Sequence, residues 1–431
     1  MTLSVTSFDF TKNLPLRREN LTHPLTLLFG AAIASLTVGI ILYRRWNVQP
    51  TSFDGAQKAY AKKKYQDTLE HCLRALRFKV GSPSEIHLLC AKAHIGLKKY
   101  DEAIGACGLA LADSAHPKKN LVFLADVNLQ WGKALANLGD WDAALAKYEL
   151  SWKTVSVFAD PFDSPRLKFE ILIEMARALR KTKEHSRIQQ ALDLACGNLY
   201  LLVPTKEVSE ENRGLFIQFY YTRIYYFLDT GSPIPAFLNC MSALEHLGKP
   251  SNDPELRMKA EILLLLSALL IKSGKAEEAF KKAEEVMHLD IIIENKEILI
   301  AAHLLRALTS SDDKLVSYNY KEALDHAQRN RVLEAAILCK RGDFHLQKGK
   351  AASDETAMEL FTKALLDFEA ALKKLDAMDS ASVGSDFLIS LFRILGLTDL
   401  KKRLGERLKD ENLTTARSLR QLQQRTGNSQ K

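Results

Sequence analysis

Glycine and proline are scarce in this chain, which contains 20 glycines and 12 prolines among its 431 residues. Their scarcity, together with an abundance of Ala, Leu, Lys and Glu, favours helix over other regular structure. Charged residues make up 26% of the sequence and hydrophobic residues 47%, which is ordinary for a folded protein and excludes a disordered one. The composition therefore predicts a folded, mainly helical protein.

The sequence also lacks the cysteine patterns of a disulfide framework or a zinc site. No two cysteines form a CxxC pair, and no histidine accompanies them at metal-ligand spacing. We therefore expect buried free thiols in a reducing compartment. They are Cys72, Cys90, Cys107, Cys196, Cys240 and Cys339.

Motifs of catalysis are missing as well. No HExxH or GxSxG sequence and no paired-carboxylate arrangement stands out, and the Ser-Gly-Lys sequence around Gly274 lacks the upstream glycine of a phosphate-binding loop. Cys339, Asp343 and His345 lie close in sequence, but helical spacing turns His345 away from the other two. We therefore expect no enzyme, no cofactor, no metal ion and no small-molecule substrate.

Positive charge exceeds negative charge, with a formal net charge of +8. No RNA-recognition, zinc-finger or helix-turn-helix signature accompanies this excess, so the sequence does not favour nucleic acid as a partner. An anionic membrane surface or an acidic protein partner stays open.

One uncharged run, residues 24–43, follows a short N-terminal segment of residues 1–23. A helix of about 20 residues spans the ~30 Å hydrocarbon core of a bilayer. Tyr43 and Trp46 stand where an interfacial aromatic belt would lie, and two arginines end the run. The sequence therefore predicts a transmembrane anchor at residues 24–43.

Two other interpretations of this run were weighed. A buried core helix would be shorter and interrupted by polar residues, and a signal peptide could be cleaved after Ala32-Ile33-Ala34. Because the apolar run continues to Tyr43, we favour a retained single-pass anchor. More lysines and arginines closely follow the run than precede it, which places the C-terminal bulk in the cytoplasm. Which membrane holds the chain is left open.

The rest of the chain repeats one helical pattern. Tyr65, Tyr100 and Trp141 each begin a segment with a small or short residue three positions later and a bulkier residue four positions further on. These positions share one helix face, since residues three and four apart are neighbours on a helix. A partner helix precedes each segment and carries a small residue where the two helices cross. These small residues are Ala56, Ala91 and Gly132.

This pattern resembles the tetratricopeptide repeat (TPR), a helix-turn-helix unit that stacks into a solenoid. The resemblance is clear over residues 51–160 and degenerate over 165–375, with capping helices expected at 383–410 and a loose basic tail at 411–431. Tyr65 and Tyr100 are 35 residues apart, close to the family period of 34, whereas 41 residues separate Tyr100 and Trp141. The predicted fold class is an all-α, TPR-like solenoid preceded by one transmembrane helix.

The resemblance implies a protein partner, because first helices of successive TPR hairpins line a groove that binds an extended peptide or a helix. Aligning the hairpins places Lys92, Lys133 and Arg177 at one groove-facing position, which suggests an acidic segment of the partner as the ligand. A solvated charged face is the alternative interpretation of these cations. The remaining groove candidates are Gln57, Tyr60, Arg180, Tyr221 and Tyr225.

The function expected from these features is that of a membrane-anchored scaffold or adaptor. Two alternatives stay open: a regulatory module or host-membrane-directed effector of an intracellular bacterium, and a receptor or assembly factor of an organelle membrane. All three use the same repeats to bind protein, so the residues alone do not separate them.

Overall fold

The computed structural model describes residues 53–113, 121–158, 164–202, 210–250, 252–289, 295–328, 330–376 and 385–428. Every element in these ranges is an α-helix, which confirms the predicted all-α class. The chain divides into two compact units, one ending at Phe158 and the other beginning at Ala159.

The predicted membrane anchor at residues 24–43 lies outside the described residues. Among the helices that the structure does describe, none is both long enough and apolar enough to cross a membrane. The anchor is therefore still a prediction from sequence.

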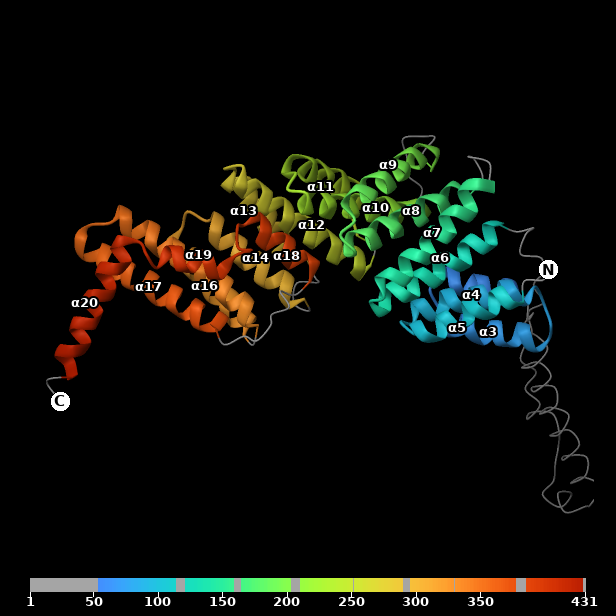
Figure 1. The fold of residues 1–431 in the computed structure, drawn as a ribbon, viewed down its shortest axis with the longest axis horizontal. Coiled ribbons are helices and arrows are strands. Elements are labelled where there is room, and N and C mark those ends of the chain that lie inside the picture. The colour runs from blue at the N-terminus through green and yellow to red at the C-terminus, as the bar shows by residue number, and fades with distance from the viewer. Residues whose placement is uncertain are drawn as a thin grey trace, which may run out of the picture. The chain divides into compact units, whose positions relative to one another are not determined.

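The first unit contains three helical hairpins in its described part, each made of two neighbouring helices that pack together (Figure 1). We call the leading helix of each pair the first helix and its partner the second helix. The pairs are α2 (Phe53–Ala61) with α3 (Tyr65–Arg77), α4 (Pro83–Gly96) with α5 (Tyr100–Ala112), and α6 (Leu121–Leu138) with α7 (Trp141–Phe158).

The second unit continues the same pattern through five more hairpins and ends with three helices, α18 (Asp386–Ile394), α19 (Leu400–Arg407) and α20 (Glu411–Asn428). The five hairpins are α8 (Pro165–Lys181) with α9 (His185–Leu202), α10 (Glu210–Asp229) with α11 (Pro233–Leu247), α12 (Asp253–Lys272) with α13 (Ala276–Met287), α14 (Lys296–Thr309) with α15 (Asp313–Ala327), and α16 (Arg331–Ala351) with α17 (Asp354–Asp376).

The turn inside the first six hairpins is the same in each case. The residue two positions before the second helix has a positive φ, for example +60° at Lys98 and +89° at Gly139. The next residue donates its backbone N–H to the carbonyl five positions earlier, as Asp140 does to Leu135 at 3.1 Å. This is the Schellman ending of a helix, which reverses the chain sharply and brings the second helix back along the first. The degenerate hairpin α8/α9 has this turn too, at Lys183.

Small residues at the predicted crossing points allow the paired helices to approach closely. Ala56 and Ala91 are fully buried, as are Ala103 and Ala144 on second helices. A Cβ atom added at Gly132 would lie 2.5 Å from the Tyr148 ring, so only glycine fits beneath this tyrosine. The crossing-point prediction is therefore confirmed.

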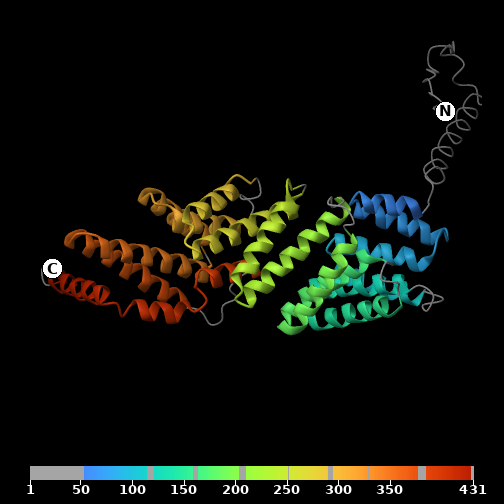
Figure 2. The same cartoon turned by 90° about the horizontal axis from the view of Figure 1, so that it is seen from above.

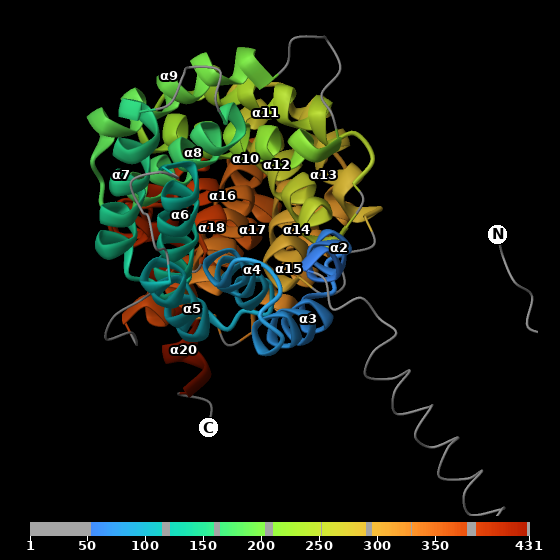
Figure 3. The same cartoon turned by 90° about the vertical axis from the view of Figure 1, so that its right-hand side faces the viewer.

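The C-terminal helices differ from the sequence prediction. Helix α18 packs against α12 and α10 instead of capping the last hairpin, whereas α19 packs against α16 and α17. Figure 2 shows the red C-terminal helices lying alongside the earlier hairpins of this unit, and in Figure 3 α18 lies among the first helices. The chain therefore turns back on itself after α17.

The predicted loose tail at residues 411–431 is wrong for most of its length. Helix α20 covers Glu411–Asn428 and packs against α17. Leu413 and Ala416 are buried there, while Arg417 and Arg420 each form an ion pair with Glu369 of α17 at 3.3 Å. The sequence prediction failed here because the segment is rich in polar and basic residues, whereas its contacts with α17 depend on how the chain folds back.

Candidate functional site

The first-helix face of the first unit is the surface formed by α2, α4 and α6, which contact one another in that order. Lys92 of α4 donates a hydrogen bond to Asp126 of α6, with 2.6 Å between Nζ and Oδ2. Gln130 donates to the other oxygen of the same carboxylate at 2.9 Å. Lys133 lies on the same side of α6, because it follows Asp126 and Gln130 by seven and three residues. The face therefore mixes cations, a carboxylate and an amide.

Two predicted groove residues come from α2. Gln57 is exposed, whereas Tyr60 is partly buried with its ring centroid 5.8 Å from that of Tyr65. Gln57 is therefore accessible to a partner, and Tyr60 offers only part of its ring.

The predicted row of cations carries less net charge than its sequence suggests. Lys92 is paired with Asp126, and Arg177, which lies on α8 in the second unit, binds both carboxylate oxygens of Glu174 at 3.0 and 2.9 Å. Glu174 could be recognised from its i, i+3 spacing, but Asp126 lies 34 residues after Lys92 on another helix. Sequence spacing alone could therefore not reveal the pairing of Lys92 with Asp126.

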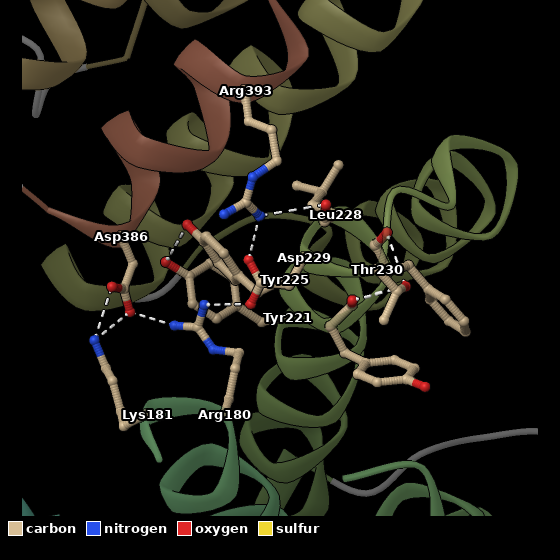
Figure 4. Close-up of polar contacts among 11 residues, drawn as sticks. Arg180, Lys181, Tyr221, Tyr225, Leu228, Asp229, Thr230, Asp386 and Arg393 are labelled. Atoms are coloured by element: carbon tan, nitrogen blue, oxygen red, sulfur yellow. Dashed lines mark hydrogen bonds and ion pairs between the residues drawn. The ribbon is translucent and has the colours of Figure 1, made fainter. Parts of the chain in front are cut away.

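In the second unit, α18 lies on the corresponding first-helix face, formed by α8, α10, α12 and α14. Arg180 of α8 binds Asp229, the last residue of α10, at 3.3 Å and also binds Asp386 at the start of α18 (Figure 4). Lys181 contacts Asp386 as well, at 2.7 Å. Near the other end of α18, Arg393 binds Asp229. Ion pairs therefore hold α18 to α8 and α10 at both of its ends.

Two side chains of this ion-pair network are shielded from solvent, whereas Lys181, Asp386 and Arg393 are partly exposed. The side chains of Arg180 and Asp229 are only 13% and 16% exposed. Burial raises the pKa of the Asp386 carboxyl, but the positive charges of Arg180 and Lys181 and their hydrogen bonds outweigh burial and leave that pKa below its usual value. Asp386 is therefore ionised at neutral pH and holds both cations.

Two tyrosines predicted to line an open groove belong to a buried network instead. Tyr221 of α10 donates to Glu261 of α12, and its hydroxyl oxygen lies 3.1 Å from that of Tyr225. Arg257 donates to the same glutamate at 2.9 Å, and the Arg180 guanidinium stacks over the Tyr225 ring. Burial raises the pKa of both tyrosines, so both keep their protons as hydrogen-bond donors. The tyrosines join α10 to α12 and do not form an open surface.

Helix α18 covers this face with apolar side chains. Its N-cap, Ser385, donates to Glu297 of α14 at 2.6 Å. These contacts were not predicted from the sequence, although the segment DFLISLFRI carries a signal of its own. It is a short apolar run with an acid at one end and a base near the other. The buried apolar residues are Phe387, Leu388, Leu391 and Phe392.

Two of the buried thiols, Cys107 and Cys339, lie in environments that suppress reactivity. Burial raises the pKa of Cys339 to about 11 and that of Cys107 to about 12, so both are protonated at neutral pH. Asp343 binds Arg403 at 2.7 Å, whereas His345 lies 3.8 Å from Asp367. The residues that stood close in sequence around Cys339 therefore have different partners.

No protein-family model and no curated protein matches the chain. Solved structures do: a Rap protein complexed with competence and sporulation factor is 13% identical, with a TM-score of 0.42 over 82% of this chain and 97% of that one. The C-terminal part of a TPR repeat-containing protein from Cytophaga hutchinsonii is 12% identical (TM-score 0.32, 76% and 100% covered). The P58(IPK) TPR domain is 15% identical (TM-score 0.23, 83% and 98% covered).

At these identities and TM-scores, the similarities concern the fold alone. The hairpins themselves carry the assignment, through their repeated Schellman turns and small-residue crossings. The described part of the chain therefore has a helical-repeat fold that resembles the TPR fold.

Proposed function

We propose that this chain is a membrane-anchored adaptor that binds a segment of a protein partner on the first-helix face of its first unit. One observation carries the proposal: the corresponding face of the second unit already holds an amphipathic helix, α18, through buried apolar residues and ion pairs. The described residues of the first unit all belong to its three hairpins or their turns, and none of them forms a helix with the role of α18. A segment from another protein would complete this face.

The partner segment that fits best is acidic. In the second unit, the acid at the start of α18 binds the first-helix cations Arg180 and Lys181. In the first unit, Lys92 and Lys133 lie on first helices in the same way, and a partner carboxylate would share or replace Asp126 as the partner of Lys92. Charge-assisted contacts of this kind weaken as salt rises, so partner affinity should fall with ionic strength.

Residues 24–43 supply the anchor in this proposal. The uncharged run and its positive C-terminal flank support a single-pass orientation with the repeats in the cytoplasm. Tethering would hold the bound partner near the bilayer and raise its local concentration there.

The test begins with the full-length chain in its native membranes. Protease added to the outside of sealed, right-side-out membranes should leave the repeats intact. After solubilisation, affinity capture should recover a partner, which mass spectrometry identifies and a binding titration then quantifies. Digestion of the repeats from outside would contradict the proposed orientation.

A matched pair of variants locates the binding face. Gln57→Glu with Lys133→Glu changes first helices, whereas Gln66→Glu with Lys153→Glu makes the same change of charge at exposed positions on second helices. We expect the first pair to weaken partner binding at least about tenfold, which is ~1.4 kcal/mol, and the second pair to leave it unchanged. Equal effects of the two pairs would refute the proposed face.

A further inference from the structure

Two histidines and a glutamate gather between α14 and α15. His303 lies on α14, and Glu322 and His326 lie one turn apart on α15. One nitrogen or oxygen atom from each side chain can be chosen so that all three lie within 4.8 Å of one another. His326 Nε2 is 3.9 Å from a Glu322 oxygen, and the two imidazole rings stack with centroids 6.1 Å apart. Within the described ranges, no other three His, Cys, Asp or Glu side chains come together in this way.

A neighbouring amide determines which nitrogen of His303 is available. Asn319 donates its Nδ2–H to the backbone carbonyl of Leu315 at 2.8 Å, which orients its oxygen toward His303 Nδ1, also at 2.8 Å. Nδ1 must therefore carry a proton, and in the neutral ring the lone pair lies on Nε2. An oxygen acceptor on the second imidazole nitrogen is the usual support of a metal-binding histidine.

The cluster combines a rigid buried ligand with two accessible ones. His303 is 4% exposed, whereas the side chains of Glu322 and His326 are 28% and 35% exposed. Arg306, the nearby cation, is bound to Glu284 at 2.8 Å.

We propose that His303 Nε2, the Glu322 carboxylate and the His326 imidazole bind a zinc ion, with a fourth position open to water. Two imidazoles and one carboxylate are a common ligand set for this borderline ion. Tetrahedral ligands at about 2.0–2.1 Å from zinc lie about 3.3 Å from one another. The ligand atoms now lie within 4.8 Å of one another, so zinc binding requires the accessible side chains on α15 to move inward.

Zinc titration of the metal-stripped, full-length chain tests this site. We expect one high-affinity ion per chain in competition with a chromophoric chelator, and affinity at least tenfold weaker in Glu322→Gln and His326→Gln. His288→Gln is the matched control, because His288 pairs with Glu284 at the same i, i+4 spacing and the same 3.9 Å distance. Circular dichroism should show unchanged helix content in all three variants.

Cobalt substitution separates this site from adventitious binding by thiols. Histidine and carboxylate ligands give visible cobalt bands without the intense near-ultraviolet band of a thiolate ligand. A thiolate band, no zinc binding by the wild-type chain, or full affinity in both α15 variants would each overturn the proposal. Loss of affinity in His288→Gln equal to that in His326→Gln would overturn it as well.

Discussion

Single glycines set the distance between paired helices. Gly132 of α6 lies beneath Tyr148 of α7, and Gly342 of α16 lies beneath Phe368 of α17 in the same way. The tyrosine and the phenylalanine are both fully buried. Because the core is tightly packed, neither the Tyr148 ring nor the Phe368 ring can move aside without displacing its neighbours.

Replacement of Gly132 by alanine should therefore destabilise the first unit. The added Cβ would lie 2.5 Å from the Tyr148 ring, and we expect a cost of about 1–3 kcal/mol from overpacking. Native-state hydrogen exchange at the amides of α6 and α7 measures this loss locally, without requiring the whole chain to unfold in one step.

Gly105 provides the control for this substitution. It is an exposed helical glycine with no atom within 4 Å of an added Cβ. Alanine there should stabilise α5 by about 0.5–1 kcal/mol, since glycine in a helix interior carries an entropic cost. If Gly132→Ala and Gly105→Ala changed hydrogen-exchange protection in the same direction, the claim that Gly132 is required where α6 and α7 cross would be contradicted.

The sequence predicted which small residues lie where paired helices cross better than it predicted which charged residues form ion pairs. The small residues at Ala91, Gly132 and Ala144 were identified from sequence, because each must occupy the same place in a repeating hairpin. The carboxylate that pairs with Lys92 was not, because Asp126 is adjacent to it only after two hairpins have stacked. Contacts that depend on stacking have no local pattern in the sequence.

At the scale of elements, α18 is the helix whose placement changes the interpretation most. Its segment was predicted from sequence to belong to the C-terminal capping helices at 383–410. Hydrophobic periodicity indicates that one face of a helix packs against another element, but it does not show which element. The structure places α18 on α10 and α12, the two helices that the network of Tyr221 and Tyr225 joins. Of the groove residues predicted in the second unit, Tyr225 is therefore buried and Tyr221 is partly buried, whereas Arg177 is exposed on α8.

The ion pairs of Asp386 should control how firmly α18 is held. In Asp386→Asn, Arg180 keeps Asp229 but loses one carboxylate, and Lys181 loses its contact with the Asp386 carboxylate. These side chains are partly exposed, so we expect a loss of about 1–2 kcal/mol, between the values for exposed and buried pairs. Faster hydrogen exchange at the amides of α18 would measure this loss of stability.

The loss of stability caused by Asp386→Asn should depend on pH. The folded-state pKa of Asp386 is lowered, so its contribution is complete above the unfolded-state value of about 4 and is lost as pH falls through the folded-state value. The difference between wild type and Asp386→Asn should therefore be largest near neutral pH and shrink in acid. Asp376→Asn removes a more exposed ion pair with Lys401 and should leave α18 unchanged. A difference that grew in acid would contradict the assignment.

At the scale of the whole molecule, the same hairpin architecture recurs in both units, but their first-helix faces have different surroundings. In the second unit, the first-helix face holds a helix of the same chain, and its core extends continuously from α10 to α20. In the first unit, the described hairpins have their own core, and the polar contacts of Lys92, Asp126 and Gln130 lie on the first helices. Repetition made the hairpins predictable from sequence, whereas the contacts of α18–α20 depend on how far the chain folds back.

The central claim is that the first helices of the first unit bind a partner segment. Site-specific photo-crosslinking in native membranes tests it most directly, with the photoreactive residue placed at Gln57 or Lys133 and, as controls, at Gln66 or Lys153. We predict a discrete crosslinked partner from the two first-helix positions and none from the two second-helix positions. Crosslinks to the same partner from the second-helix positions alone would contradict the account.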